Sequence, residues 1–108
     1  MANTFKSNVA ANIVTSGNTI YTCPSATQTT LIGLTLSNKS AGTLTANVYL
    51  TRSAVDYALI ANAPILSGST LVPIGGDQKV VMQASDSLKI TASANASVDV
   101  IASLLEIT

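Results

Sequence analysis

The feature that most constrains this chain is the regular recurrence of turn-forming residues. Short runs of apolar residues alternating with Ser, Thr or Asn end repeatedly at Gly, Asn or Pro. A period of two puts alternate side chains on opposite faces of a β-strand, whereas an amphipathic helix needs apolar residues three and four positions apart. The turn signals recur about every 8–12 residues, a spacing typical of β-sandwiches and jelly rolls. The sequence therefore predicts an all-β fold, an antiparallel, jelly-roll-like β-sandwich of about eight or nine short strands.

Two neighbouring runs predict a β-hairpin. In the first run the expected inward face consists of Thr30, Ile32, Leu34 and Leu36. In the second run it consists of Leu44, Ala46, Val48 and Leu50. The turn-forming segment 38–42 lies between the runs, so we expect them to pair directly.

The segment 52–63 is compatible with two structures. Val55, Leu59 and Ala63 have the spacing of one helix face, whereas Tyr57, Leu59 and Ala61 would line one face of a strand. The neighbouring segments are strands and a lone helix would need its own packing face, so we favour a strand. Pro73, in the run 71–74, indicates an edge strand or a strand end.

The two ends of the chain carry more apolar surface than one sheet face needs. In the run 98–107, one face carries Val98, Val100, Ala102 and Leu104, and the other carries Ile101, Leu105 and Ile107. Such a strand is either covered on both faces or gives one face to a partner subunit. In the N-terminal run, Phe5, Ser7, Val9, Ala11 and Ile13 are expected to share a face, and residues 2–9 to form an arm or an edge strand. The residues expected to contact partners are Phe5, Val9, Ile101, Leu105 and Ile107.

Length and apolar content point to a single domain that associates with copies of itself. The 108 residues fit one β-sandwich domain, 1–108, and 47% of them are hydrophobic, more than the core of one small domain requires. No run approaches the roughly 20 apolar residues of a membrane-spanning helix, so no membrane partner is expected. The formal net charge is zero and the five Lys and Arg residues form no basic stripe. A nucleic-acid partner is therefore not expected, and a homo-oligomer is.

The sequence offers little for catalysis, and we expect no enzymatic activity, catalytic residue, cofactor or metal site. There is no His, and Cys23 is the only cysteine, so it lacks the base of a nucleophile and the companions of a zinc ligand. The stretch 75–79 lacks the spacing of a phosphate-binding loop and is expected to be a turn. The acids Asp56, Asp77, Asp86, Asp99 and Glu106 are dispersed singly and have no D-x-D pattern. Most are expected to cap turns, with a Ca²⁺ site as the alternative.

Tyr21, Tyr49 and Tyr57 suggest a rival function, a module that binds host-surface glycans. Each is expected on an exposed or half-exposed face, where aromatic rings can stack on sugars. The chain has no Trp, so we favour ordinary sheet-surface or interface positions for these tyrosines.

Much of the chain resembles a group of small tailed-bacteriophage virion proteins. The resemblance is carried in the C-terminal half by 57–65 (YALIANAPI), 68–72 (GSTLV), 75–82 (GGDQKVVM), 86–90 (DSLKI) and 98–107 (VDVIASLLEI). In the N-terminal half it is carried by 20–22 (IYT) and 32–38 (IGLTLSN). These are strand and turn patterns, so no functional residue is carried over. Ser85 stands where the group often has Gly before the Asp of the Asp-Ser-Leu stretch.

The resemblance implies a non-enzymatic structural subunit located in the virion and assembled in the host cytoplasm. Its partners would be copies of itself and other virion proteins, such as the major capsid or tail proteins. A capsid decoration, or cement, protein is favoured because the domain is small, neutral and lacks a fibrous repeat. A neck or tail component is the alternative placement.

Overall fold

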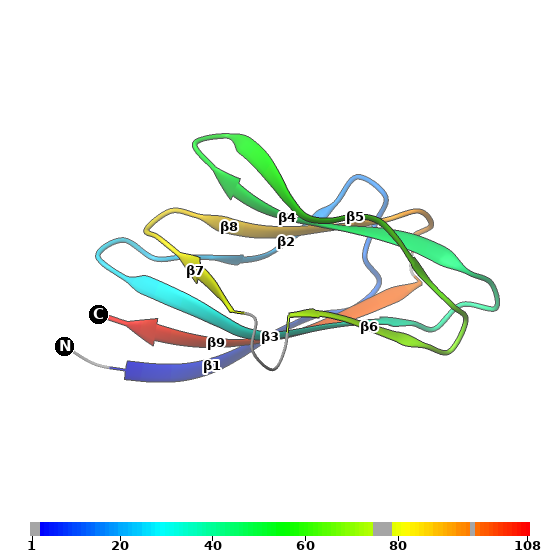
Figure 1. The fold of residues 1–108 in the computed structure, drawn as a ribbon, viewed down its shortest axis with the longest axis horizontal. Coiled ribbons are helices and arrows are strands. Elements are labelled where there is room, and N and C mark those ends of the chain that lie inside the picture. The colour runs from blue at the N-terminus through cyan, green and yellow to red at the C-terminus, as the bar shows by residue number, and fades with distance from the viewer. Residues whose placement is uncertain (1–2, 75–78, 96) are drawn as a thin grey trace.

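The computed structural model describes residues 3–74, 79–95 and 97–108, which fold into nine strands (Figure 1). The strands are β1 (Asn3–Ala10), β2 (Asn18–Thr22), β3 (Gln28–Asn38), β4 (Leu44–Arg52), β5 (Val55–Ile65), β6 (Thr70–Ile74), β7 (Val80–Met82), β8 (Ser87–Ala92) and β9 (Val98–Ile107). Within these ranges no helix is long and apolar enough to cross a membrane. The predicted all-β class and strand number are confirmed.

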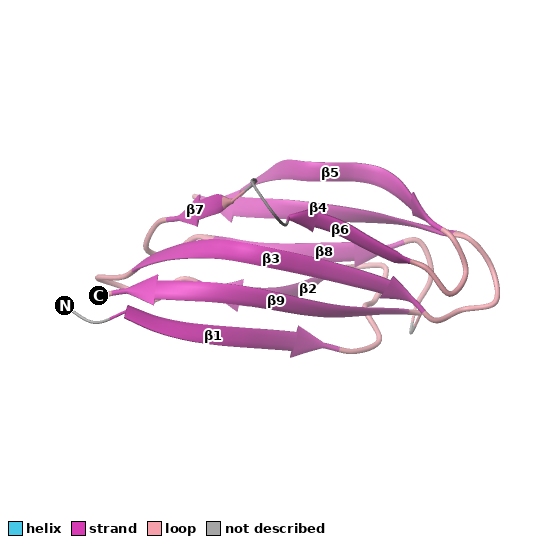
Figure 2. Ribbon diagram, turned by 60° about the horizontal axis from the view of Figure 1, so that its bottom comes forward, coloured by secondary structure: helices cyan, strands magenta, loops and turns pink. Residues whose placement is uncertain are grey.

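The strands form two antiparallel sheets packed face to face. The five-stranded sheet has the order β1-β9-β3-β6, with β7 also paired to β3, and the four-stranded sheet has the order β2-β8-β4-β5 (Figure 2). Alternate residues of each strand point between the sheets, and the fully buried side chains include Leu34, Leu36, Val48, Ile90 and Leu104. This is a β-sandwich with one core between two layers.

The predicted hairpin is wrong, although its two strands exist. β3 pairs with β9, β6 and β7, whereas β4 pairs with β8 and β5, so the two strands lie in different sheets. The segment between them crosses from one layer to the other, and buried Asn38 holds this crossing. Its Nδ2 donates to the carbonyls of Gly42 at 2.9 Å and Ile65 at 2.8 Å, and its Oδ1 accepts from the backbone N–H of Ser40. Crossing lets each strand bury its apolar face against the opposite sheet.

The inward face predicted for β3 is partly wrong, because this strand contains a bulge. The pairing of β3 with β9 shifts register between Leu31 and Gly33, which changes the phase of the alternation by one residue. Leu34 and Leu36 point into the core as predicted, but Leu31 is buried before the bulge. Thr30 and Ile32, predicted to be inward, are only half-buried. The inward face predicted for β4 is correct for Leu44, Ala46 and Val48, while Leu50 is half-buried against the core.

The N-terminal run ends earlier than predicted. β1 lies at the edge of the five-stranded sheet and stops at Ala10. Asn12 adopts a left-handed φ of 59°, which turns the chain. Ile13 then enters the core, where its N–H donates to the carbonyl of Val98 at 3.0 Å. Ile13 therefore does not share the exposed face of Phe5 and Val9.

The segment that was compatible with helix or strand is a strand, as favoured. β5 runs from Val55 to Ile65 along β4, with register shifts at Ala46/Val48 and Val48/Tyr49. β6, which contains Pro73, is an edge strand as predicted. The turn expected at 75–78 lies outside the described residues.

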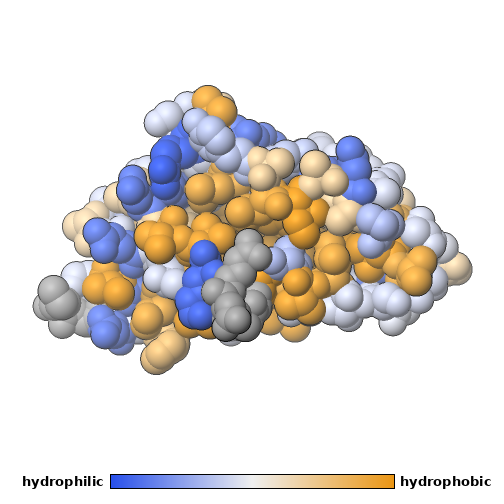
Figure 3. All heavy atoms as spheres, viewed as in Figure 1, coloured by the Kyte–Doolittle hydropathy of each residue, from blue (hydrophilic) through white to orange (hydrophobic). Residues whose placement is uncertain are grey.

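One side of the core is only partly closed. Figure 3 shows apolar side chains gathered along the middle of the molecule, between the strands of the two sheets. Leu59, Ile60, Leu71 and Val80, from β5, β6 and β7, are partly buried and pack against the core. The core therefore reaches the surface beside these edge strands.

Ser85, at the position where the resembling proteins often have Gly, adopts a left-handed backbone conformation. Its φ is 73°, in the left-handed region that glycine adopts without a Cβ clash. The turn is held by the N–H of Ser85, which donates to the carbonyl of Cys23 at 2.9 Å, and by the N–H of Asp86, which donates to that of Gln83 at 3.0 Å. The glycine-like turn therefore forms with a serine.

Candidate functional site: an apolar sheet face

The predicted partner-contact residues from both ends of the chain come together on the outer face of the five-stranded sheet. The pairing of β1 with β9 sets Phe5 opposite Leu105 and Val9 opposite Ile101, and residues directly opposite in an antiparallel pair point to the same side. Phe5 is 77% exposed, Val9 70% and Ile101 53%. Leu105 and Ile107 are half-buried.

Two further apolar residues extend this face, and the sequence reasoning missed both. Leu105 pairs with Thr30, which pairs with Val81 of β7, so one cross-strand row runs from Phe5 to Val81. On β6, Thr70 pairs with Ser37 of β3, and alternation puts Val72 on the same outer side. Val81 is 61% exposed and Val72 58%. β6 and β7 are too short for periodicity alone to fix which side their residues face.

Charge is scarce on this face. Among the outward positions of β1, β9 and β3, the only charged residue is Asp99, near one end of the face. Its carboxylate accepts from Lys39 Nζ at 3.0 Å and from the backbone N–H of Asn12 at 3.1 Å. The hydrogen bond from Lys39, followed by that from Asn12, lowers the pKa of Asp99. Away from this end the face offers apolar and small uncharged side chains.

The outer face of the four-stranded sheet is polar and bonded to itself. Asn47 Nδ2 donates to Thr91 Oγ1 at 2.9 Å, and Asn47 Oδ1 accepts from the backbone N–H of Asn62 at 2.7 Å. Asp56 accepts from Thr51 Oγ1 at 2.6 Å and from Lys89 Nζ at 3.4 Å. The hydrogen bond from Thr51, and then the one from Lys89, lower the pKa of Asp56. This face satisfies its own polar groups.

The structure does not bring the three tyrosines together. Tyr21, predicted to be exposed or half-exposed, is instead 5% exposed. Its hydroxyl donates to Glu106 Oε2 at 2.5 Å and lies 2.8 Å from Thr29 Oγ1. Burial, followed by the hydrogen bond to Glu106, raises the pKa of Tyr21. Tyr49 is half-buried on β4 and Tyr57 exposed on β5, so no platform of three rings exists.

The acids of the described ranges serve structural bonds, and no group of three or more potential metal ligands occurs there. Asp86 is 2% exposed and accepts two hydrogen bonds from Arg52, from Nε at 2.9 Å and from Nη2 at 2.5 Å. It also caps its own turn through the N–H of Gln83, at 2.8 Å. Asp77 lies outside the described residues. Cys23 is buried, as expected of a core residue, and its Sγ lies 3.2 Å from Thr29 Oγ1.

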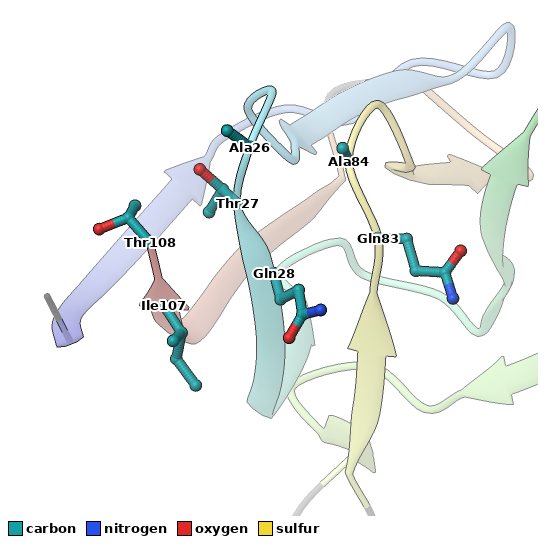
Figure 4. A pocket seen from close by; sticks show the side chains of 7 residues that line it. All are labelled: Ala26, Thr27, Gln28, Gln83, Ala84, Ile107 and Thr108. Atoms are coloured by element: carbon teal, nitrogen blue, oxygen red, sulfur yellow. The ribbon is translucent and has the colours of Figure 1, made fainter. Parts of the chain in front are cut away.

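A cavity of about 500 Å³ opens at one end of the sandwich (Figure 4). It is lined by Ala26, Thr27, Gln28, Gln83, Ala84, Ile107 and Thr108. None of these side chains is ionisable, so the lining supplies no general acid or base.

Comparison with known proteins supports the fold. No family model and no curated sequence matches the chain. A solved structure described as "Bacillus endospore appendages form a novel family of disulfide-linked pili" matches with a TM-score of 0.55 at 12% identity, over 100% of this chain and 91% of that one.

A chain from the T13 viral particle of IBDV matches with a TM-score of 0.54 at 12% identity. The match covers 96% of this chain and 30% of that one, so this chain spans about a third of the viral protein. At such identity the likeness concerns the fold alone. The chain is therefore a β-sandwich similar in fold to a pilus subunit and to a jelly-roll-like part of a viral particle protein.

Proposed function

We propose that this protein is a non-enzymatic structural subunit that associates with copies of itself through the outer face of the five-stranded sheet. The observation that carries the proposal is the contrast between this face, with Phe5, Val9 and Ile101 more than half exposed, and the self-bonded polar face of the other sheet. Exposed apolar patches of this kind mark interaction surfaces in soluble proteins.

Burial of this face would contribute favourable free energy to association. Complete burial of a Phe, Val or Ile side chain contributes about 1.5–3 kcal/mol, and these three side chains still expose half or more of their surface. Several such residues can offset the cost of immobilising a partner, which is roughly 4–15 kcal/mol. Few charges would have to be desolvated, since Asp99 and Lys39 lie at the end of the face.

The two structural neighbours support a role in assembly, since one is described as forming pili and the other belongs to a viral particle. The pili are described as disulfide-linked. Here the single cysteine, Cys23, is 1% exposed, so copies of this chain would associate without a disulfide through that residue. Apolar contact is the interaction that the exposed surface favours.

For the place of this subunit, we favour the virion of a tailed bacteriophage and, within it, the decoration of the capsid. The resemblance of segments 57–65, 86–90 and 98–107 to small phage virion proteins supports this placement. A neck or tail component is the second candidate, supported by the full-length likeness to a pilus subunit, which also belongs to a filament.

Light scattering after size exclusion tests the association. The parent chain is expected to be an oligomer, and Ile101→Lys to stay folded but have a lower mass, because it places an unpaired charge in the contact between outer faces. Ala58→Lys is the matched control, since Ala58 is exposed on the outer face of the four-stranded sheet, and it should leave the oligomer intact. A monomeric parent at concentrations well above micromolar would overturn the proposal.

A second experiment separates the two placements. A decoration protein should bind emptied heads of its own phage and raise the temperature at which they break. A tail or neck component should leave heads unchanged and co-purify with tails.

A further inference from the structure

The sandwich has several sheet edges, and all but one carry features that discourage pairing with another chain. Edge strands expose unpaired N–H and C=O groups, and proteins blunt them by shortness, proline, bulges or charge. β7 has three residues, and β2 and β6 have five each. The pairings of β2 and β6 contain register shifts, and β6 contains Pro73. β5 is long but contains Pro64, left-handed Asn62 and two register shifts along its partner.

β1 is the exception. All eight of its residues pair with β9 in unbroken register, and it contains neither Pro nor Gly. Six of the eight are exposed. Its one charge, Lys6, lies 3.5 Å from Glu106, which points toward the interior and binds Tyr21. The lysine that could protect this edge is therefore directed to its own subunit.

We propose that β1 pairs antiparallel with β1 of a second copy about a two-fold axis perpendicular to the sheet. This pairing rests on the proposed self-association and adds a second contact, at the sheet edge beside the apolar outer face. It would fuse the two five-stranded sheets into one continuous sheet, and both apolar faces would lie on the same side.

The sequence of β1 fits one register of this pairing. Residues opposite each other must point to the same side, so the symmetric registers are those centred on a residue. With Ser7 on the axis, Phe5 lies opposite Val9 of the partner subunit, and residues 4–10 all find partners within β1. A register centred on Lys6 would put the two lysines opposite each other, which is unfavourable. A register centred on Asn8 would put Phe5 opposite residue 11, beyond the end of the strand.

Disulfide trapping tests the contact, with Cys23→Ser as the parent so that only the introduced thiol can react. In the proposed register the two Ser7 Cα atoms lie about 4.5–5.5 Å apart, within reach of a disulfide. Ser7→Cys is therefore expected to give a covalent dimer under mild oxidation. Ser103→Cys is the matched control, because Ser103 is exposed and lies directly opposite Ser7 on β9. Its two copies would be three strand spacings apart, roughly 14 Å, and should not cross-link.

A proline pair provides a second test that does not depend on oxidation. The N–H groups of Lys6 and Ser7 point to opposite sides of β1, so one bonds to β9 and the other faces the free edge. Of Lys6→Pro and Ser7→Pro, the variant whose proline replaces the N–H at the free edge is expected to stay folded and to have a lower mass than the parent. If both variants fold and both keep the mass of the parent, the edge pairing is overturned.

The outcomes separate this inference from the proposed function. An oligomeric parent that cross-links through Ser7→Cys supports both. An oligomer that cross-links through Ser103→Cys instead indicates that the apolar faces stack against each other; this overturns the edge pairing and retains self-association. A monomeric parent overturns both.

Discussion

The outer faces of the two sheets come from the same kind of strand, yet they differ in how their side chains are satisfied. On the four-stranded sheet, Asn47, Thr51 and Asp56 bond to neighbours in adjacent strands or across the hairpin. On the five-stranded sheet, Phe5 and Val9 lie beside Leu105 and Ile101 and remain largely exposed. Polar groups that are already paired gain little from a partner, whereas exposed apolar groups gain from any dry contact. This difference is the reason for placing the proposed contact on the five-stranded sheet.

Two of the ion pairs, one from each sheet, also differ in burial. Arg52 of the four-stranded sheet forms a salt bridge with buried Asp86. Lys39 and Asp99, at the end of the five-stranded sheet, are both about half exposed. The four-stranded sheet therefore uses its polar side chains to hold the subunit together. The outer face of the other sheet contributes little to the stability of a single copy.

The largest effect on the free energy of unfolding is expected for Arg52→Met. It leaves the Asp86 carboxylate, 2% exposed, without its two guanidinium hydrogen bonds, and should cost about 2–3 kcal/mol. Lys39→Met makes the same chemical change at the exposed pair and should cost at most about 0.5 kcal/mol. Urea denaturation of the two variants measures the difference. Equal losses in the free energy of unfolding would contradict the claim that the buried pair stabilises the fold more than the exposed one.

An intermediate effect is expected for Asn47→Ala. Asn47 bridges β8 to Asn62, a left-handed residue within β5 next to a register shift, and its removal leaves the N–H of Asn62 and the hydroxyl of Thr91 unpaired. The expected loss is about 1–2 kcal/mol, measured in the same way. Thr35→Ala, on the outer face of the five-stranded sheet, is the control and should change stability by about 0.5 kcal/mol or less. If Thr35→Ala proved the more damaging, the two faces would not differ as described.

The smallest effect is expected in the pH dependence of stability. The hydrogen bonds from Arg52, reinforced by that from Gln83, lower the pKa of Asp86 below its ordinary value of 3.8, despite the opposing effect of burial. A carboxylate with a lowered folded pKa stabilises the fold above its ordinary pKa, and this stability is lost as the pH falls through the folded value. Stability should therefore decrease below about pH 4.

The matched test compares Asp86→Asn with Asp99→Asn, since the pKa of Asp99 is lowered too, chiefly by Lys39. Asp86→Asn should flatten the acid dependence more than Asp99→Asn, because Asp86 is buried and Asp99 is half exposed. Unfolding curves at neutral and acid pH provide the measurement. A larger change for Asp99→Asn would show that the exposed pair matters more.

The contact residues were only partly predictable. Phe5, Val9 and Ile101 were identified from the sequence because each lies in a strand long enough for its apolar residues to be assigned to faces. Val72 and Val81 were missed because β6 and β7 span five and three residues, and their place on the face depends on pairing with β3. Tyr21 was wrongly placed at the surface, since its partner Glu106 is 85 residues away in sequence.

Local alternation was enough to determine the all-β class, the positions of most strands and the inward faces of 44–48 and 98–104, because period two is a property of each strand alone. Only the tertiary structure decided that β3 and β4 belong to different sheets, that a bulge turns Thr30 and Ile32 away from the core, and that the N-terminal strand lies beside the C-terminal one. These outcomes depend on backbone hydrogen bonds between distant segments, and any exposed strand edge can in principle accept any other. The choice among partners is made by the packing of the whole core, which no single run of residues encodes.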